Sequence, residues 1–217
     1  MTFKVYSIVP VKGTLLGKSR LLSVLSDNIR RKLVILMFKD VITSLKESKF
    51  LSGIIVVSPD DKILNLSRKY GCIAIKEKPK SLGLNRAVKL GVNAAIARHA
   101  DAVLIVSADV PLVTREDIDY IISIGYDLSK NQPYMIIAPS KDGGTNILML
   151  SLPSSFTFKY GFHSCKKHLA EAIKLGLKTI IVYNERISLD LDKKEDIEFI
   201  IKSCTDKETV KFLRSVL

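Results

Sequence analysis

The chain has 217 residues, a hydrophobic content of 47% and a formal net charge of +12. These values indicate one globular domain with a substantial core, and the longest apolar runs, such as 102–106, are too short to span a bilayer. Three widely separated cysteines without a C-x-x-C pair indicate neither a disulfide framework nor a zinc site. The N-terminus reaches Lys and Pro too early for a secretory signal, so we expect a cytoplasmic protein with no membrane segment.

The positive charge is compatible with a nucleic-acid surface or with small polyanionic ligands. Aromatic residues make up 7% of the chain and tryptophan is absent, so stacking platforms for single strands are poorly supplied. There is also no low-complexity basic tail. We therefore expect small phosphorylated ligands and no nucleic acid, and we keep a basic nucleic-acid-binding protein as the remote alternative.

Apolar runs alternate with helical periodicities along the first half of the chain. Capping residues mark the helix ends: Asp60 or Asp61 and Gly71 for one helix, and Thr114 for another. The predicted elements are strand 3–11, helix 26–47, strand 53–59, helix 60–71, strand 72–76, helix 83–99, strand 101–109 and the Thr114-capped helix.

The second half begins with two apolar runs, 134–140 and 145–151, separated by Lys-Asp-Gly-Gly, which predicts a β-hairpin. A helix at about 165–175, a strand at 179–183, the segment 187–192 and closing helices follow. Continuous Ile/Val runs predict strands that are covered on both faces. We therefore predict a single α/β domain over residues 1–217, with a mixed, mainly parallel sheet and a late antiparallel hairpin.

Ligands of such sheets bind outside the carboxyl ends of the strands. This rule selects the residues directly after each apolar run as candidates for a site. The candidate segments are 12–20, 58–61, 107–109, 143–146 and 190–192.

The first candidate segment contains Gly-Lys-Ser, the end of a phosphate-binding P-loop. The spacing between Gly13 and Gly17 is one residue short of that motif, so the P-loop interpretation fails. Lys12, Lys18 and Arg20 nevertheless lie on one loop after the first strand. Their charged groups could hold a triphosphate, or they could be ordinary solvated cations.

Carboxylates follow two of the predicted strands. Asp109 directly follows a buried run, where it could bind Mg²⁺ or serve as a turn residue, although Thr114 is the better helix cap. Asp190 and Asp192 alternate along an extended segment and so share one face, which costs energy unless a cation lies between them. Asp192 also stands at the natural N-cap of the helix that begins near Lys193. Carboxylates that hold Mg²⁺ opposite a basic loop are typical of phosphoryl or nucleotidyl transfer.

Three further stretches are less specific. The sequence "KDGGTN" (141–146) fits a tight turn or an anion-binding backbone. Gly161 and Ser164 precede a helix, of which Ser164 is the expected N-cap. Gly83 and Asn85 begin another helix, where Asn85 could be a cap or contact a purine. His99, His163 and His168 are not spaced as a zinc set, and a Ser or Cys nucleophile with a paired base is not apparent.

The order of these motifs, "VPVK…KSRL", "LN-x-A", "VSADVPLV", "GGTN", "YGFHSCKKH" and "LDLD", resembles the 2-phospho-L-lactate guanylyltransferases of deazaflavin coenzyme F420 biosynthesis, some of which use phosphoenolpyruvate. The resemblance extends from Val9 to about Ile197. It implies a nucleotidyltransferase fold like that of nucleotide-diphospho-sugar transferases, with GTP and a small phosphorylated carboxylic acid (below, the phospho-acid) as substrates, Mg²⁺ as cofactor and a homodimer.

The resemblance also implies roles for individual residues. Those predicted are Lys12, Lys18 and Arg20 for the GTP phosphates, Gly83 and Asn85 near the base, Asp109 and Asp192 for Mg²⁺, and Thr145, Gly161 and Ser164 for the phospho-acid.

Two departures from the family pattern affect the choice of phospho-acid and the start of the helix that follows Asp192. Phe162 and His163 stand where the family usually has Pro-Gly, and the usual Thr-Pro does not follow Asp192.

Alternatives are a nucleotidyltransferase with another acceptor, such as molybdopterin or a sugar phosphate, and an inactive protein that keeps the fold. The first usually opens with an "LAGG"-type loop, which this chain lacks, and the pair Asp109 and Asp192 argues against the second.

Overall fold

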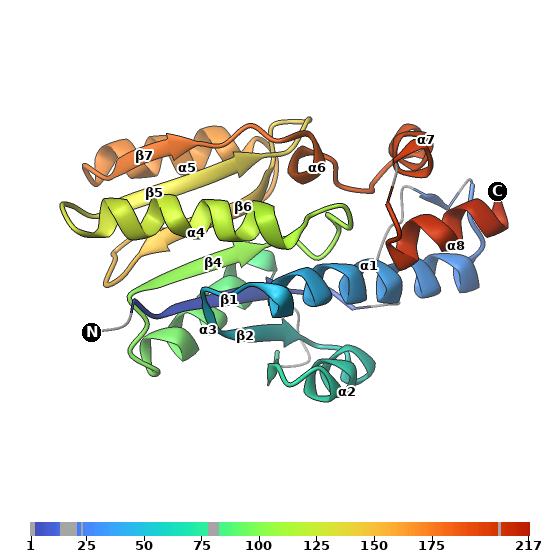
Figure 1. Ribbon diagram of the computed structural model, residues 1–217, viewed down its shortest axis with the longest axis horizontal. Helices are drawn as coiled ribbons and strands as arrows, with labels where there is room; N and C mark the ends of the chain where they lie inside the picture. The colour runs from blue at the N-terminus through green and yellow to red at the C-terminus, as the bar shows by residue number, and fades with distance from the viewer. Residues whose placement is uncertain (1–2, 14–20, 23, 78–82, 204) are drawn as a thin grey trace.

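The computed structural model describes residues 3–13, 21–22, 24–77, 83–203 and 205–217. In these residues a seven-stranded sheet has the order β3-β2-β1-β4-β6-β5-β7, and helices cover both of its faces (Figure 1). The mixed sheet and its late hairpin confirm the predicted architecture. Across the described residues, we find no helix with the length and apolar character needed to cross a membrane.

The elements follow the alternation of the sequence closely. The strands are β1 (Val5–Pro10), β2 (Leu51–Ser58), β3 (Ile73–Lys76), β4 (Ala102–Val106), β5 (Tyr134–Pro139), β6 (Thr145–Ser151) and β7 (Lys178–Ile181). The helices are α1 (Asp27–Glu47), α2 (Asp61–Lys69), α3 (Leu84–Ile96), α4 (Arg115–Ser129), α5 (Ser164–Lys174), α6 (Glu185–Ser188), α7 (Lys194–Lys202) and α8 (Glu208–Val216).

The strand β6 is the antiparallel member of the sheet and lies between β4 and β5. Because it runs against β4, its first residues lie beside the carboxyl end of β4, where Val106 pairs with Ile147. The N–H of Ser107 then donates to the carbonyl of Asn146 (2.9 Å). The start of β6 therefore reaches the same edge of the sheet as the carboxyl ends of the parallel strands.

Two core clusters cover the sheet, one on each face. Alternate residues of β4 enter different clusters: Leu104 and Val106 pack with α1 and α4, whereas Val103 and Ile105 pack with α3 and α5. All five residues of this strand are buried. This two-sided burial is the physical reason for the continuous apolar runs from which a mainly parallel sheet was predicted.

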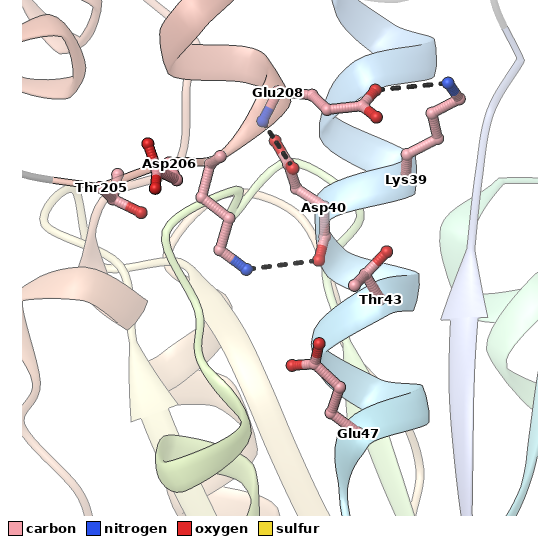
Figure 2. Close-up of a pocket in the computed structure, with 8 residues that line it drawn as sticks. Lys39, Asp40, Thr43, Glu47, Thr205, Asp206 and Glu208 are labelled. Carbon is pink, nitrogen blue, oxygen red and sulfur yellow. Dashed lines mark hydrogen bonds and ion pairs between the residues drawn. The ribbon is translucent and has the colours of Figure 1, made fainter.

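The C-terminal helix α8 lies alongside α1, beyond the end of the sheet (Figure 1). Figure 2 shows part of the contact: the Asp40 carboxylate on α1 accepts a hydrogen bond from the N–H group of Glu208 (2.9 Å). The same carboxylate also accepts from the N–H group of Thr209 (2.8 Å). The ammonium group of Lys207 donates to the Ser44 hydroxyl (2.5 Å) and the Val113 carbonyl (3.0 Å). A carboxylate of α1 thus satisfies the first free N–H groups of α8.

Candidate active site

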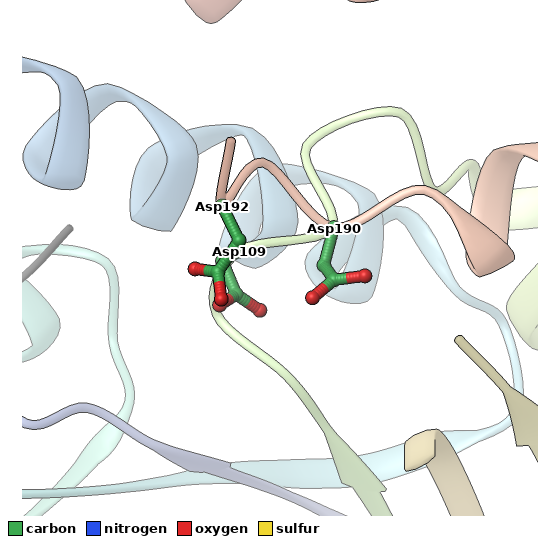
Figure 3. A group of neighbouring side chains, drawn as sticks. All are labelled: Asp109, Asp190 and Asp192. Atoms are coloured by element: carbon green, nitrogen blue, oxygen red, sulfur yellow. The ribbon is translucent and has the colours of Figure 1, made fainter. Parts of the chain in front are cut away.

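Three carboxylates meet at the carboxyl end of β4. Asp109, Asp190 and Asp192 each offer an oxygen atom, and these oxygens all lie within 4.8 Å of one another (Figure 3). All three side chains are partly exposed. Asp109 comes from the loop after β4 and the other two from the segment between α6 and α7. Segments that are distant in sequence thus form one acidic cluster.

The backbone holds the two segments together. The N–H of Leu191 donates to the carbonyl of Asp109 (3.0 Å), which places both neighbours of Leu191 beside Asp109. Leu189 and Leu191 are buried in a core cluster with residues of α1, α7 and α8. Since residues alternate along an extended segment, burial of the two leucines turns Asp190 and Asp192 to the other side. This agrees with the shared face predicted from the sequence.

Two neutral side chains support the cluster. The Ser107 hydroxyl donates to Asp109 Oδ1 (2.6 Å). The buried amide of Asn146, at the start of β6, donates to the Ile187 carbonyl (2.8 Å) and lies 3.5 Å from Asp190 Oδ1. Sequence reasoning assigned no role to Ser107 or Asn146 individually, although both lie in segments selected by the strand-end rule.

The donor set of this cluster fits a hard divalent cation. Mg²⁺ prefers oxygen ligands and is commonly held by one or two carboxylates together with substrate phosphates. Like charges at this separation also favour a bound cation. The structure brings the predicted pair Asp109 and Asp192 together and adds Asp190, while their magnesium role stays a prediction.

The predicted N-cap role of Asp192 is wrong. The helix α7 begins at Lys194 with Lys193 as its N-cap. The carboxylate that serves this end is Asp196, which accepts from the N–H groups of Asp192 (2.9 Å) and Lys193 (2.7 Å). An acidic residue inside the first turn thus performs the capping, and the Asp192 carboxylate belongs to the acidic cluster.

An ion pair between the exposed Arg186 and the buried Asp117 anchors the segment that leads to this cluster. Arg186 in α6 donates to both carboxylate oxygens of Asp117 in α4 (2.6 and 3.0 Å), and the Asn184 amide donates to the same group (2.8 Å). Thr114 completes a capping box with Asp117. Burial alone would raise the pKa of Asp117, but its hydrogen bonds with Arg186 and Thr114 and the charge of Arg186 hold the pKa below its ordinary value.

We expect Asp117→Asn to lower the free energy of unfolding by about 2 kcal/mol at neutral pH, because it removes the buried charge that accepts hydrogen bonds from Arg186 and Asn184. A carboxyl group whose pKa is lower in the folded state than in the unfolded state stabilises the protein when the pH is above the ordinary, unfolded-state pKa. This contribution disappears as the pH falls through the pKa of the folded state. The destabilisation caused by Asp117→Asn should therefore be constant above about pH 5 and become smaller below about pH 4.

Urea unfolding between pH 3 and pH 8 measures this effect. Asp127→Asn is the matched control, because Asp127 lies on the same helix in an exposed pair with Lys130. A difference between wild type and Asp117→Asn that grows as the pH falls would contradict the assignment.

Two of the residues predicted to hold the phospho-acid are in direct contact. The Ser164 hydroxyl donates to Thr145 Oγ1 (3.2 Å), and His168 Nδ1 lies 3.1 Å from the same oxygen. Gly161 has φ of +124°, a region that favours glycine, and its carbonyl accepts from the N–H of Ser164 (3.1 Å). The predicted N-cap role of Ser164 is wrong, because Ser164 is the first helical residue and His163 is the cap, with φ of +51°.

Gly83 and Asn85 lie at the start of α3. Gly83 is its N-cap, with φ of +90°. The Asn85 amide forms two hydrogen bonds with the backbone of Tyr160, accepting from its N–H (2.7 Å) and donating to its carbonyl (3.3 Å). Asn85 thereby joins α3 to the segment that carries Gly161. The predicted contact with the base stays a prediction.

Lys12 is exposed just beyond β1, whose continuation is fixed by a hydrogen bond from the N–H of Val11 to the Val57 carbonyl (2.9 Å). Gly13 follows with φ of +107°, and a Cβ there would lie 3.2 Å from Asp60 Cβ. Gly13 therefore lies close to the carboxyl end of β2. Lys18 and Arg20, the other two predicted phosphate ligands, lie outside the described residues.

The sequence matches the protein family described as "Guanylyl transferase CofC like" over residues 5–217. It is 36% identical to the 2-phospho-L-lactate guanylyltransferase of Methanocaldococcus jannaschii over 216 residues, which cover 98% of this chain and 89% of the relative. It is 31% identical to the phosphoenolpyruvate guanylyltransferase of Conexibacter woesei, with 89% of this chain and 85% of the relative covered.

Solved structures with low sequence identity share the fold. A nucleotidyl transferase from Methanothermobacter superposes with a TM-score of 0.65 at 14% identity, covering 97% of this chain and 98% of the other. A cytidylyltransferase from Leptospira borgpetersenii gives a TM-score of 0.60 at 17% identity, covering 100% and 94%. The predicted nucleotidyltransferase fold is thereby confirmed.

Proposed function

Because the chain belongs to the family of CofC-like guanylyl transferases, we propose that it joins the guanylyl group of GTP to 2-phospho-L-lactate and releases pyrophosphate. The structural observation that carries this proposal is the cluster of Asp109, Asp190 and Asp192 at the carboxyl ends of the strands. Phosphoenolpyruvate is the alternative phospho-acid, since one relative is named for that activity. The product would serve coenzyme F420 biosynthesis.

The reaction needs an in-line attack by a phosphate oxygen of the phospho-acid on the α-phosphorus of GTP. This oxygen is already anionic, so the chain need not supply a general base. The obstacle is repulsion between two polyanions, which fixed charges and dipoles reduce. Asp109, Asp190 and Asp192 would hold Mg²⁺ here, and the bound ion would stabilise charge on the phosphates.

The other residues bind and orient the substrates. Lys12, together with Lys18 and Arg20, would hold the triphosphate. Thr145, Gly161 and Ser164 would hold the phospho-acid by hydroxyl and backbone donors, and the start of α5 favours negative charge there. Gly83 and Asn85 would lie near the guanine. We further propose that the protein is a cytoplasmic homodimer.

Pyrophosphate release by the purified protein with Mg²⁺ tests this function. We expect release with GTP and either 2-phospho-L-lactate or phosphoenolpyruvate, and much less with ATP, CTP or UTP or with 3-phosphoglycerate. Activity should require the phospho-acid, and the guanylylated product should be identified by mass spectrometry. Absence of release with both phospho-acids, for protein with a cooperative unfolding transition, would refute the proposal.

A further inference from the structure

His168, the buried histidine of α5, directly contacts Thr145, which is predicted to bind the phospho-acid. His168 is fully buried, and both of its ring nitrogens have partners. The backbone N–H of Lys159 donates to Nε2 (2.9 Å), and Nδ1 lies 3.1 Å from Thr145 Oγ1. Tyr160 and Phe156 pack around the ring. Because His168 follows Ser164 by one helical turn, both side chains lie on the same face of α5.

These contacts determine which nitrogen carries the proton. A backbone N–H can only donate, so Nε2 must offer its lone pair to Lys159, and the imidazole is neutral with its proton on Nδ1. Nδ1 therefore donates to Thr145 Oγ1. The environment agrees with a neutral ring, since burial and the nearby Lys159 charge lower the pKa of His168 to about 4.

The donation from His168 decides what the two hydroxyl groups can do. Thr145 and Ser164 each have one O–H, and the hydrogen bond between them uses one of the two. If Nδ1 instead accepted from Thr145, the second O–H would be used as well. Because Nδ1 donates, one O–H stays available, and within the described residues neither hydroxyl donates to a further atom.

We propose that His168 is a positioning residue that directs one hydroxyl proton of the Thr145–Ser164 pair toward an anionic group of the phospho-acid. This inference rests on the proposed function, which places the phospho-acid at these hydroxyls. Such a donor favours an oxyanion over a neutral group, because a hydrogen bond to a charged acceptor is about twice as strong as a neutral one. His168 thereby contributes to selection of a charged phospho-acid without touching it.

Two substitutions of similar size separate positioning from a merely structural role. Asparagine retains a donor near the Nδ1 position and loses the Nε2 acceptor, whereas glutamine places an acceptor near Nε2 and loses the donor toward Thr145. We expect His168→Gln to raise the KM for the phospho-acid about tenfold, the effect of one hydrogen bond. We expect His168→Asn to keep that KM within about threefold, and the KM for GTP to be unchanged in both.

The exposed His99 supplies the control. Its φ of +56° is one that asparagine tolerates, so His99→Asn should leave all kinetic constants unchanged. In a Thr145→Val background, His168→Gln should add little, because the hydroxyl that it orients is gone. Equal losses in His168→Gln and His168→Asn, or a rise in the KM for GTP, would overturn the proposal.

A measurement on the unmodified protein does not depend on how the variants fold. In protein with ¹⁵N-labelled histidine, NMR should show His168 protonated on Nδ1 and unprotonated on Nε2 near neutral pH. A proton on Nε2 would overturn the inference even if the enzyme transfers guanylyl groups normally. Conversely, failure of pyrophosphate release in wild type would refute the proposed function while the measured tautomer stood, so the two failures are distinguishable.

Discussion

Asp109→Asn should lower kcat by at least about a hundredfold while the protein remains folded. Its carboxylate shares the cluster with Asp190 and Asp192, within 4.8 Å, and an amide is a much weaker ligand for a hard cation. Loss of one charge-stabilising contact in a transition state costs about 3 kcal/mol, or roughly a hundredfold in rate. The fold should persist because the Asp109 side chain is partly exposed. The substitution also leaves unchanged the backbone carbonyl of Asp109, which accepts a hydrogen bond from the N–H of Leu191.

Steady-state pyrophosphate release, with circular dichroism of the same samples, measures this effect. Asp127→Asn makes the same chemical change at an exposed position of α4 and should be fully active. A second readout is Mg²⁺ itself: addition of Mg²⁺ should raise the melting temperature of the wild type and of the control, but not that of Asp109→Asn. Full activity of Asp109→Asn would remove this residue from the proposed metal site.

The second large effect concerns the other predicted magnesium ligand. We expect Asp192→Asn to reduce kcat about as much as Asp109→Asn, and the double variant to be little worse than either single variant. In the proposed site both carboxylates would act through one bound ion, so once the ion is lost the second substitution would have nothing further to remove. The same rate assay on the two single variants and the double variant forms a complete thermodynamic cycle.

Asp196→Asn controls for disturbance of the chain near Asp192. Asp196 accepts from the N–H groups of Asp192 and Lys193 but lies outside the three-carboxylate cluster. We expect this variant to lose stability at the start of α7 and to keep its response to Mg²⁺. Strict multiplication of the two losses in the double variant of Asp109 and Asp192 would show that the carboxylates act independently.

Much of the fold could be predicted because its signals are local. The run 102–106 is apolar throughout since β4 is buried on both faces, and Lys-Asp-Gly-Gly between two apolar runs indicates the β5–β6 hairpin. The place of that hairpin could not be predicted. The position of β6 between β4 and β5 depends on pairing between residues that are far apart in the sequence. This position brings Asn146 to the acidic cluster.

The candidate site was predictable where position along a strand was sufficient, as for Asp109. Helix caps misled the assignment at two places. Ser164 and Asp192 have the side chains of typical N-caps, but α5 begins one residue earlier, and α7 one residue later, than those roles require. The actual N-caps are His163 and Lys193. His168 was missed because its role depends on Lys159 and Thr145, whose proximity only the folded chain establishes.

The distribution of the three carboxylates along the chain has a consequence for biosynthesis. A ribosome produces β1 to β4 and Asp109 long before the segment 189–192, which supplies the other two carboxylates and the N–H that donates to Asp109. A nascent chain can therefore arrange much of the sheet before the acidic cluster exists. If the cluster binds Mg²⁺ as proposed, the metal site can form only after the segment 189–192 has been synthesised, so the proposed activity should not appear before that point.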